Sequence, residues 1–275
     1  MAVNRRVFVS ALFLASYAAA APLCTSLTTL DAYIDTGAGG CQLGDKLFSN
    51  FSYGAGGTGV LASGVAVTTS SANGGLDLAL TFTGNWIAAA AVGQTTQTTD
   101  VTLRFNVSAP SSLPMWQTGL SMTGQIFYTR PVGIIESVGK IQAGETVGPG
   151  AIASLSPAPI TTSSSSPDSS IQTSSSSATF SDRTFLTVSK DLTLSSGGST
   201  SQTIANNPAY QAESVKLISF TETFYERPVP EPAVFFTFGG GLLVLGLAGK
   251  RFMPATRKSA SISEQDKNKN NSEAL

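Results

Sequence analysis

The residues of this chain that could do chemistry are few, and one class is missing altogether. The 275 residues include 16 Lys or Arg, 17 Asp or Glu, two Cys and no His. Without histidine the chain lacks the usual general base, the Ser-His-Asp and Cys-His nucleophile arrangements and the commonest metal ligand. Charged residues make up only 12% of the chain, against about 25% in an ordinary soluble domain. We therefore predict no catalytic residue and expect a protein that is not an enzyme.

The carboxylates form no recognisable pair. Asp31, Asp35 and Asp45 lie near the amino end, and Asp77 and Asp100 lie on or beside predicted strands. No stretch carries an oxygen ligand at nearly every second position, as a calcium loop requires. No Gly-rich stretch ends in the Lys-Ser/Thr of a phosphate-binding loop. The sequence predicts neither a metal site nor a cofactor.

The two cysteines, Cys24 and Cys41, are the remaining reactive pair. In an oxidising compartment they most simply form one disulfide. A bridge that closes a loop of this length stabilises a fold by about 3 kcal/mol. Free buried thiols and a reactive thiol are the alternatives, although neither cysteine has an obvious basic neighbour.

The segment between the cysteines has a helical pattern. Leu27, Leu30 and Ile34 lie at positions i, i+3 and i+7, and Thr28 precedes Asp31 by three residues as a cap-like pair. This spacing predicts a short helix at the start of the mature chain.

The rest of the body follows the two-residue period of strands. Leu76, Leu78, Leu80 and Phe82, for example, alternate with polar or small residues, as in a strand with one buried face. Predicted strands cover residues 59–69, 76–83, 100–108, 119–130, 183–194 and 213–226, and Asn73-Gly74 is a hairpin signal. We predict a mainly β domain over residues 21–228, an antiparallel β-sandwich.

One stretch of this body departs from the pattern. Residues 161–179 are nearly all Ser and Thr. Such a run buries too little apolar area to offset backbone ordering, which costs about 1–2 kcal/mol per residue. The composition predicts a flexible Ser/Thr-rich loop, and its dense hydroxyls could alternatively accept O-linked glycans.

The amino end is typical of an export signal. Arg5 and Arg6 precede an apolar run over residues 7–20 that closes in small residues, which predicts a signal peptide over residues 1–20. A retained membrane anchor is the alternative, but at about 1.5 Å per residue this run is too short to cross about 30 Å of hydrocarbon.

The carboxyl end contains a second apolar run. Residues 233–249 carry no charge, and Lys250 and Arg251 follow at once. We expect a single transmembrane helix with its carboxyl end in the cytoplasm; a buried core helix is the alternative. Residues 252–275 are polar and lack apolar periodicity, and they are predicted to be a disordered tail.

Val229, Pro230, Glu231 and Pro232 stand directly before this run. The order of V-P-E-P, Gly-rich apolar span and basic pair resembles the PEP-CTERM sorting signal of Gram-negative bacteria that produce exopolysaccharide. In this chain the signal would cover residues 229–251. The resemblance implies recognition and processing by exosortase, a membrane-integral cysteine protease. The prolines keep the segment extended, the form in which a protease binds its substrate. A Pro-rich stalk before an anchor is the alternative.

A thirty-residue segment near the start of the mature chain supports the same resemblance. Residues 24–53 are similar to the amino-terminal segment of many PEP-CTERM proteins, in which a helix flanked by cysteines leads into a G-D-x-x-F-x-N-F strand. In this chain that strand motif begins at Gly44 and ends at Phe51.

Charge and topology suggest the same route through the cell. The net charge of −1 is the sum of an acidic body and basic ends. The body, residues 21–228, has 8 Lys or Arg and 13 Asp or Glu, whereas the two ends together have 8 Lys or Arg and 4 Asp or Glu. This distribution offers no basic surface for nucleic acid. We expect an exported cell-surface or extracellular-matrix protein, held at least transiently in the inner membrane, with a structural or interaction role.

The alternative function is a carbohydrate-binding module or a polysaccharide-directed enzyme of the same matrix, with exopolysaccharide as its partner. Trp86 and Trp116, together with Tyr53, Phe127 and Tyr128, could line a sugar-binding face. In a β-sandwich such residues more often lie in the core.

Overall fold

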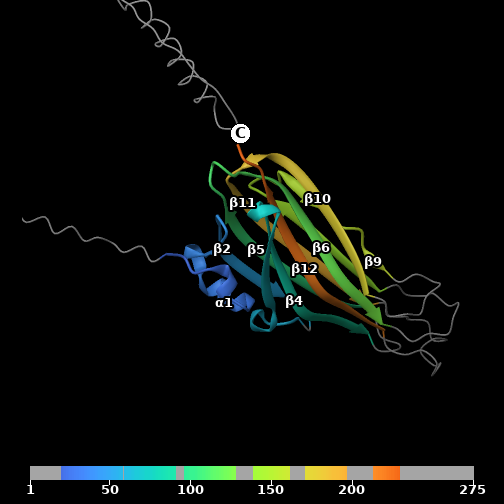
Figure 1. Ribbon diagram of the computed structural model, residues 1–275. Helices are drawn as coiled ribbons and strands as arrows, with labels where there is room; N and C mark the ends of the chain where they lie inside the picture. Colours follow the sequence, from blue (N-terminus) through green and yellow to red (C-terminus); the bar gives the residue numbers. More distant parts are fainter. Residues whose placement is uncertain are drawn as a thin grey trace, which may run out of the picture. The chain divides into compact units, whose positions relative to one another are not determined.

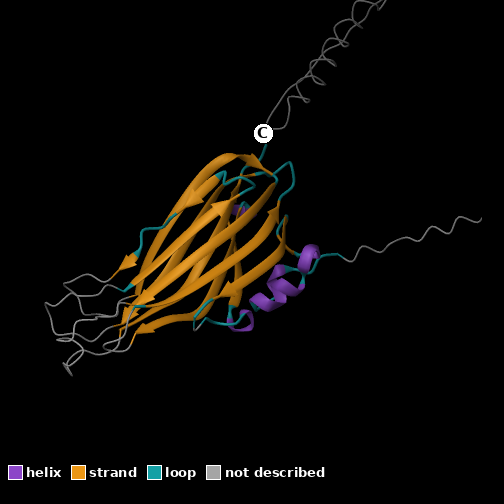
Figure 2. Ribbon diagram, turned by 180° about the vertical axis from the view of Figure 1, so that it is seen from behind, coloured by secondary structure: helices purple, strands orange, loops and turns teal. Residues whose placement is uncertain are grey.

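The computed structural model describes residues 20–57, 59–90, 96–127, 139–161, 171–196 and 213–229. Among these residues, alternating apolar and polar side chains form long strands with one buried face, as in the strand Gln97–Ser108. Figures 1 and 2 show the strands packed in two layers. All pairs of neighbouring strands within the layers are antiparallel, which confirms the predicted antiparallel β-sandwich.

The first sheet has the order β1-β2-β5-β11-β7-β8, and β9 also pairs with β7. Its strands are β1 (Cys41–Leu43), β2 (Lys46–Ala55), β5 (Gln97–Ser108), β7 (Lys140–Val147), β8 (Ala153–Leu155), β9 (Ile160–Thr161) and β11 (Phe185–Ser196).

The second sheet has the order β10-β6-β12-β4-β3. Its strands are β3 (Ala66–Ala72), β4 (Asp77–Ala90), β6 (Met115–Phe127), β10 (Ile171–Arg183) and β12 (Glu213–Glu226). β12 therefore lies at the centre, between β6 and β4, and presents one face to the first sheet.

Most of the predicted strands are confirmed with shifted ends. Of the predicted strands, residues 77–83, 100–108, 185–194 and 213–226 belong to β4, β5, β11 and β12, and residues 119–127 belong to β6. The predicted strand over residues 59–69 is largely wrong, because Ala62–Gly64 form a 3₁₀ turn (η3) and β3 begins only at Ala66.

The prediction of a flexible loop over residues 161–179 is also wrong in its second half. Residues 171–179 lie in β10, which pairs with β6 along most of its length. Backbone hydrogen bonds to β6 stabilise this edge strand, and only Ala178 and Phe180 near its end pack against the core. The composition of its serine run therefore gave the wrong prediction. Residues 162–170 lie outside the described part of the chain.

The predicted helix is present but shorter than its apolar pattern. α1 covers Leu30–Asp35, and Thr29 rather than Thr28 precedes it. Thr28 is not a cap: its carbonyl accepts a hydrogen bond from Val67 N–H at 2.9 Å. The other short turns are the 3₁₀ turns η1 (Cys24–Ser26), η2 (Gly37–Gly39) and η4 (Asn73–Gly75).

The hairpin signal is confirmed between β3 and β4. Asn73 and Gly74 in η4 both have positive φ angles, 50° and 70°. Asn and Gly adopt this backbone region with little strain, which explains why this pair connects the two strands.

Phe105 lies at the centre of the core. It projects from β5 in the first sheet and is 1% exposed. Its ring centroid lies 5.0 Å from that of Phe51 in β2, and 6.4 Å and 6.2 Å from those of Phe82 and Phe224 in the second sheet. The two layers therefore meet through this aromatic cluster.

This packing gives a stability prediction. We expect Phe105→Ala to reduce the free energy of unfolding by about 3–5 kcal/mol, because it removes a buried ring and leaves a cavity. Phe185→Ala is the matched control, since Phe185 on β11 is 46% exposed, and it should cost less than about 1 kcal/mol. Urea unfolding of both variants measures the difference, and equal losses would contradict this view of the core.

Candidate functional site

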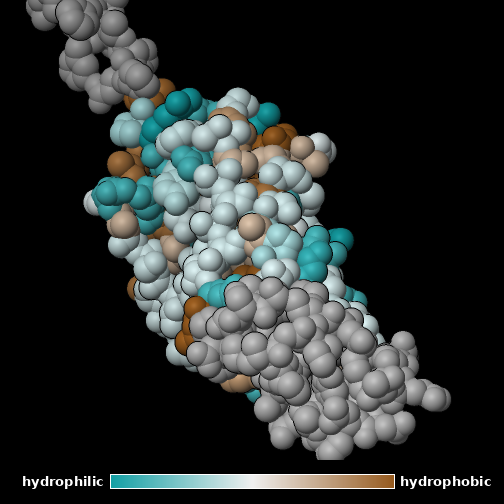
Figure 3. All heavy atoms as spheres, turned by 90° about the vertical axis from the view of Figure 1, so that its right-hand side faces the viewer, coloured by the Kyte–Doolittle hydropathy of each residue, from teal (hydrophilic) through white to brown (hydrophobic). Residues whose placement is uncertain are grey.

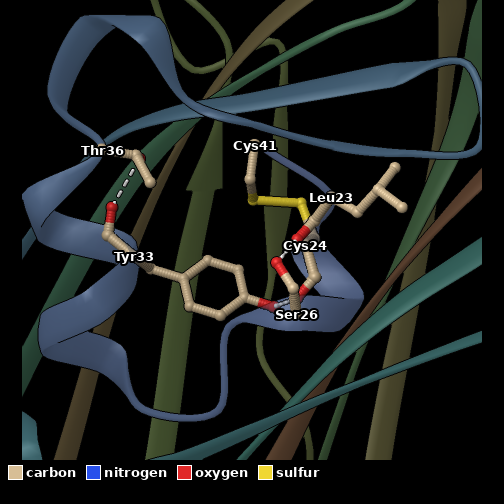
Figure 4. The surroundings of a disulfide bond; sticks show 6 residues. All are labelled: Leu23, Cys24, Ser26, Tyr33, Thr36 and Cys41. Carbon is tan, nitrogen blue, oxygen red and sulfur yellow. Dashed lines mark hydrogen bonds between the residues drawn. A yellow bond between two sulfur atoms is a disulfide. The ribbon is translucent and has the colours of Figure 1, made fainter. Parts of the chain in front are cut away.

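The disulfide corner is the best-defined chemical feature that the sequence predicted. Cys24 and Cys41 are both fully buried and joined by a disulfide, with Cα atoms 4.9 Å apart (Figure 4). This confirms the predicted pairing and rules out free thiols, because these are the only cysteines of the chain. The bridge attaches η1 to the first strand of the sheet.

A tyrosine connects α1 to the same corner. Tyr33 donates a hydrogen bond from its hydroxyl to the Cys24 carbonyl at 2.9 Å (Figure 4). Burial raises the pKa of Tyr33 to about 12, so the hydroxyl stays protonated and able to donate at physiological pH. The corner is a structural clamp with no reactive group exposed.

The predicted sorting signal lies almost wholly beyond the described residues. Val229 is the last described residue; it is 43% exposed, and its N–H donates to the Ser112 carbonyl at 3.1 Å. Pro230, Glu231, Pro232, Lys250 and Arg251 lie outside the described residues, as do the predicted signal peptide, transmembrane helix and polar tail. In the described ranges, no helix has the length and apolar character needed to cross a membrane.

The predicted aromatic face does not form. Trp86 is fully buried and donates its indole N–H to the Tyr53 hydroxyl at 2.8 Å. Trp116 is covered by Arg227, whose guanidinium carbon lies 5.7 Å from the indole centroid. Arg227 is held in turn by Asp182 at 2.8 Å. The two tryptophans therefore provide no shared sugar-binding surface, and Tyr128 lies outside the described residues.

A groove does lie on the outer face of the second sheet, where β10, β6 and β12 are neighbours. We call it the hydroxyl groove; its volume is about 390 Å³. Nearly all the side chains that line it are polar and uncharged: Gln117, Gly119, Leu120, Ser121, Ser175, Ser176, Ser177, Thr223 and Tyr225. In Figure 3 the side of the molecule with β10 is mostly pale, as expected for Ser and Thr, with few strongly hydrophobic patches.

Strand register explains how the groove forms. Gly119 on β6 faces Ser177 on β10 and Thr223 on β12, and Gln117 faces Tyr225. The Tyr225 ring lies beside Gly119, since a Cβ at Gly119 would be 3.4 Å from the Tyr225 Cε2 atom. The missing side chain at position 119 therefore opens a space bounded by hydroxyls, an amide and one aromatic ring.

Such a lining can recognise an uncharged polyhydroxylated ligand. Hydroxyl and amide groups both donate and accept hydrogen bonds, and an aromatic ring offers an apolar face to the C–H groups of a sugar. The sequence does not reveal this site, because the composition around Ser175 and Ser177 predicts a loop. The signal that could have found it is the mixed polar face of β6 and β12.

A second site that the sequence did not reveal lies between the sheets. Lys190 on β11 contacts both Glu145 on β7 and Glu222 on β12 through its Nζ atom. Thr118 on β6 donates a hydrogen bond to Glu222 Oε1. We call these four residues the buried tetrad; each is at most 2% exposed.

Electrostatics within the tetrad follow from burial. Burial raises the pKa of Glu222 well above its usual range, and the nearby Glu145 charge raises it further, although Lys190 opposes both effects. Burial lowers the pKa of Lys190, but the two carboxyls raise it more, so the net change is upward. Burial and the neighbouring charges therefore favour the protonated forms of both Lys190 and Glu222.

A second lysine makes a simpler contact between the sheets. Lys46 Nζ at the start of β2 lies 2.7 Å from Glu226 Oε1 at the end of β12 and 3.6 Å from Asp45 Oδ1. Lys46 is fully buried and Glu226 is 5% exposed. Among the described residues, no three His, Cys, Asp or Glu side chains gather as a metal would require.

Comparison with known proteins finds only weak structural matches. No family model and no curated protein matches the chain. A structure described as the structural basis for the promiscuous specificity of carbohydrate-binding modules from the β-sandwich superfamily has 14% identity, covers 76% of this chain and has a TM-score of 0.17; this chain spans 63% of that structure. A family 29 carbohydrate-binding module has 11% identity, covers 63% of this chain and has a TM-score of 0.16; this chain spans 89% of that structure. TM-scores this low do not establish a shared fold.

The disulfide corner yields a direct test. We expect the double variant Cys24→Ala/Cys41→Ala to lose about 3 kcal/mol of unfolding free energy, because its unfolded chain is no longer closed into a loop. Ser26→Ala is the matched control: it removes only the exposed hydrogen bond to the Leu23 carbonyl in the same corner. Urea midpoints that are the same for the double variant and the wild type would contradict a stabilising role for the bridge.

Proposed function

We propose that the protein is exported and acts as a non-catalytic component of the cell surface or extracellular matrix. The buried Cys24–Cys41 disulfide carries this proposal, because structural disulfides form and persist in oxidising compartments outside the cytoplasm. The predicted signal peptide over residues 1–20 supplies the route.

Sorting at the carboxyl end is the second part of the proposal. Residues 229–251 would act as a PEP-CTERM signal, with residues 233–249 as an inner-membrane span and exosortase as the processing partner. The exposure of Val229 supports this, since the signal would begin at a residue that is accessible just after the last strand.

The intact mass of the mature protein tests sorting directly. In wild-type cells we expect a protein that has lost residues from the carboxyl end, and in exosortase-deficient cells a protein that retains them. Glu231→Ala within the signal should give the unprocessed mass in wild-type cells. As the matched control, Glu273→Ala in the tail should leave processing unchanged.

An unchanged mass in the two strains, with residues 233–275 still attached, would defeat the sorting proposal. It would leave a plain single-pass anchor. Removal of residues 1–20 is read from the same spectrum and tests export separately.

A second function is favoured by the hydroxyl groove, namely binding of the surrounding exopolysaccharide. The groove is open, and its lining side chains carry hydroxyl and amide groups with one aromatic ring. A neutral polysaccharide presents the complementary hydroxyls and apolar C–H faces. This binding role needs no catalytic group and is compatible with a matrix location.

Affinity electrophoresis in gels that contain hydroxyethylcellulose or galactomannan tests the groove. Both polysaccharides are screened, and we expect at least one of them to retard the migration of the wild-type protein. Tyr225→Ala should weaken that retardation about tenfold, the equivalent of about 1.4 kcal/mol. Arg104→Ala, on the outer face of the other sheet, is the control and should bind as wild type. Equal retardation of both variants, or none of the wild type, would count against binding at this groove.

A further inference from the structure

The buried tetrad places the Lys190 amine in contact with the Glu222 carboxyl group where water is excluded. Lys190 is 1% exposed, Glu145 2%, and Glu222 and Thr118 are fully buried. Phe220 and Phe224 lie two residues to either side of Glu222 on β12 and are buried with it. An ion pair in such surroundings gains little net stability, because desolvation offsets the attraction between the charges. A gain in stability from the ion pairs therefore does not explain why these groups are buried together.

Strand register holds the reacting atoms in place. Lys190 and Glu145 are directly opposite each other on neighbouring strands of the first sheet. Glu222 reaches the same Nζ atom from the second sheet, where β12 is held on both sides by β6 and β4. Groups held in this way react as if at very high concentration, because the entropy of bringing them together is already lost on folding.

We propose that Lys190 and Glu222 condense to form an amide bond that joins the two sheets covalently. The ammonium of Lys190 first gives a proton to the Glu145 carboxylate, which leaves a neutral amine. This transfer removes two opposite charges from a low-dielectric site. The amine then attacks the Cδ atom of Glu222.

The remaining groups complete the exchange. Thr118 donates its hydrogen bond to Glu222 Oε1, the oxygen on which negative charge develops in the tetrahedral intermediate. Glu145 takes one proton from the attacking nitrogen and gives one to the departing Oε2, which leaves as water. The products are an amide, one water molecule and a protonated Glu145, so atoms and charges balance without an oxidant or co-reactant.

Glu222 rather than Glu145 is the acceptor for two reasons. Thr118 polarises the Glu222 carboxyl through its hydrogen bond. Burial raises the pKa of Glu222, which favours the protonated carboxyl, and the carbon of a protonated carboxyl is the better electrophile. The pair Lys46 and Glu226 makes a similar contact and serves as the internal comparison.

Peptide mapping of the purified full-length protein tests the proposal. Trypsin should fail to cleave after Lys190, and the peptide of residues 184–216 should remain linked to the peptide that begins at Leu217. Their combined mass should be lower than the sum by one water molecule. A link from residues 184–216 to residues 141–183 would assign Glu145 as the acceptor and overturn the role of Glu222.

Variants separate the bond from the ion pairs. The intact mass of the wild type and of Lys46→Met should be lower by one water molecule than the mass calculated from the amino-acid sequence. The intact mass of Lys190→Met should equal the calculated mass. Glu145→Gln retains both partners but removes the proton acceptor, so the deficit should disappear there as well. Wild-type protein that trypsin cleaves at Lys190, with unlinked peptides of full mass, would overturn the proposal even if every variant failed to fold.

Discussion

Each of the two sheets buries a single face, and this constraint decides where every chemical group of the domain lies. Phe82 and Phe224 reach Phe105 across the interface because their strands alternate with a period of two residues. The same alternation turns Tyr225 and Gln117 outward, where they line the hydroxyl groove. It turns Lys190 and Glu222 inward, where they have no access to water and must contact each other.

The sequence predicted the features that depend on local patterns. Alternation identified β4, β5, β11 and β12, Asn73-Gly74 identified a hairpin, and an oxidising compartment implied the Cys24–Cys41 bridge. β10 was missed because its run of serines shows no apolar alternation, and only Ala178 and Phe180 pack against the core. Its stability comes from pairing with β6, which local composition does not encode.

Neither candidate site could be predicted in the same way. The members of the buried tetrad lie on four strands. Strand order in the first sheet brings Glu145 to Lys190, and the packing of the second sheet on the first brings Glu222 to the same atom. A signal was nevertheless present, because Lys190 and Glu222 both occupy apolar positions of strongly alternating strands. A charge at such a position requires a partner from elsewhere in the fold. The hydroxyl groove likewise required the knowledge that β10 is a strand.

The inward faces of the two sheets bring Lys190 and Glu222 into contact, and an amide bond between them is the proposed outcome. The most direct measurement is a nitrogen-15 NMR spectrum of the full-length protein labelled at its lysine side chains. We expect the Lys190 nitrogen to appear as an amide that carries one proton and is protected from exchange with water. A Lys190 signal typical of a solvent-exchanging ammonium, like those of exposed lysines, would contradict both the burial and the bond.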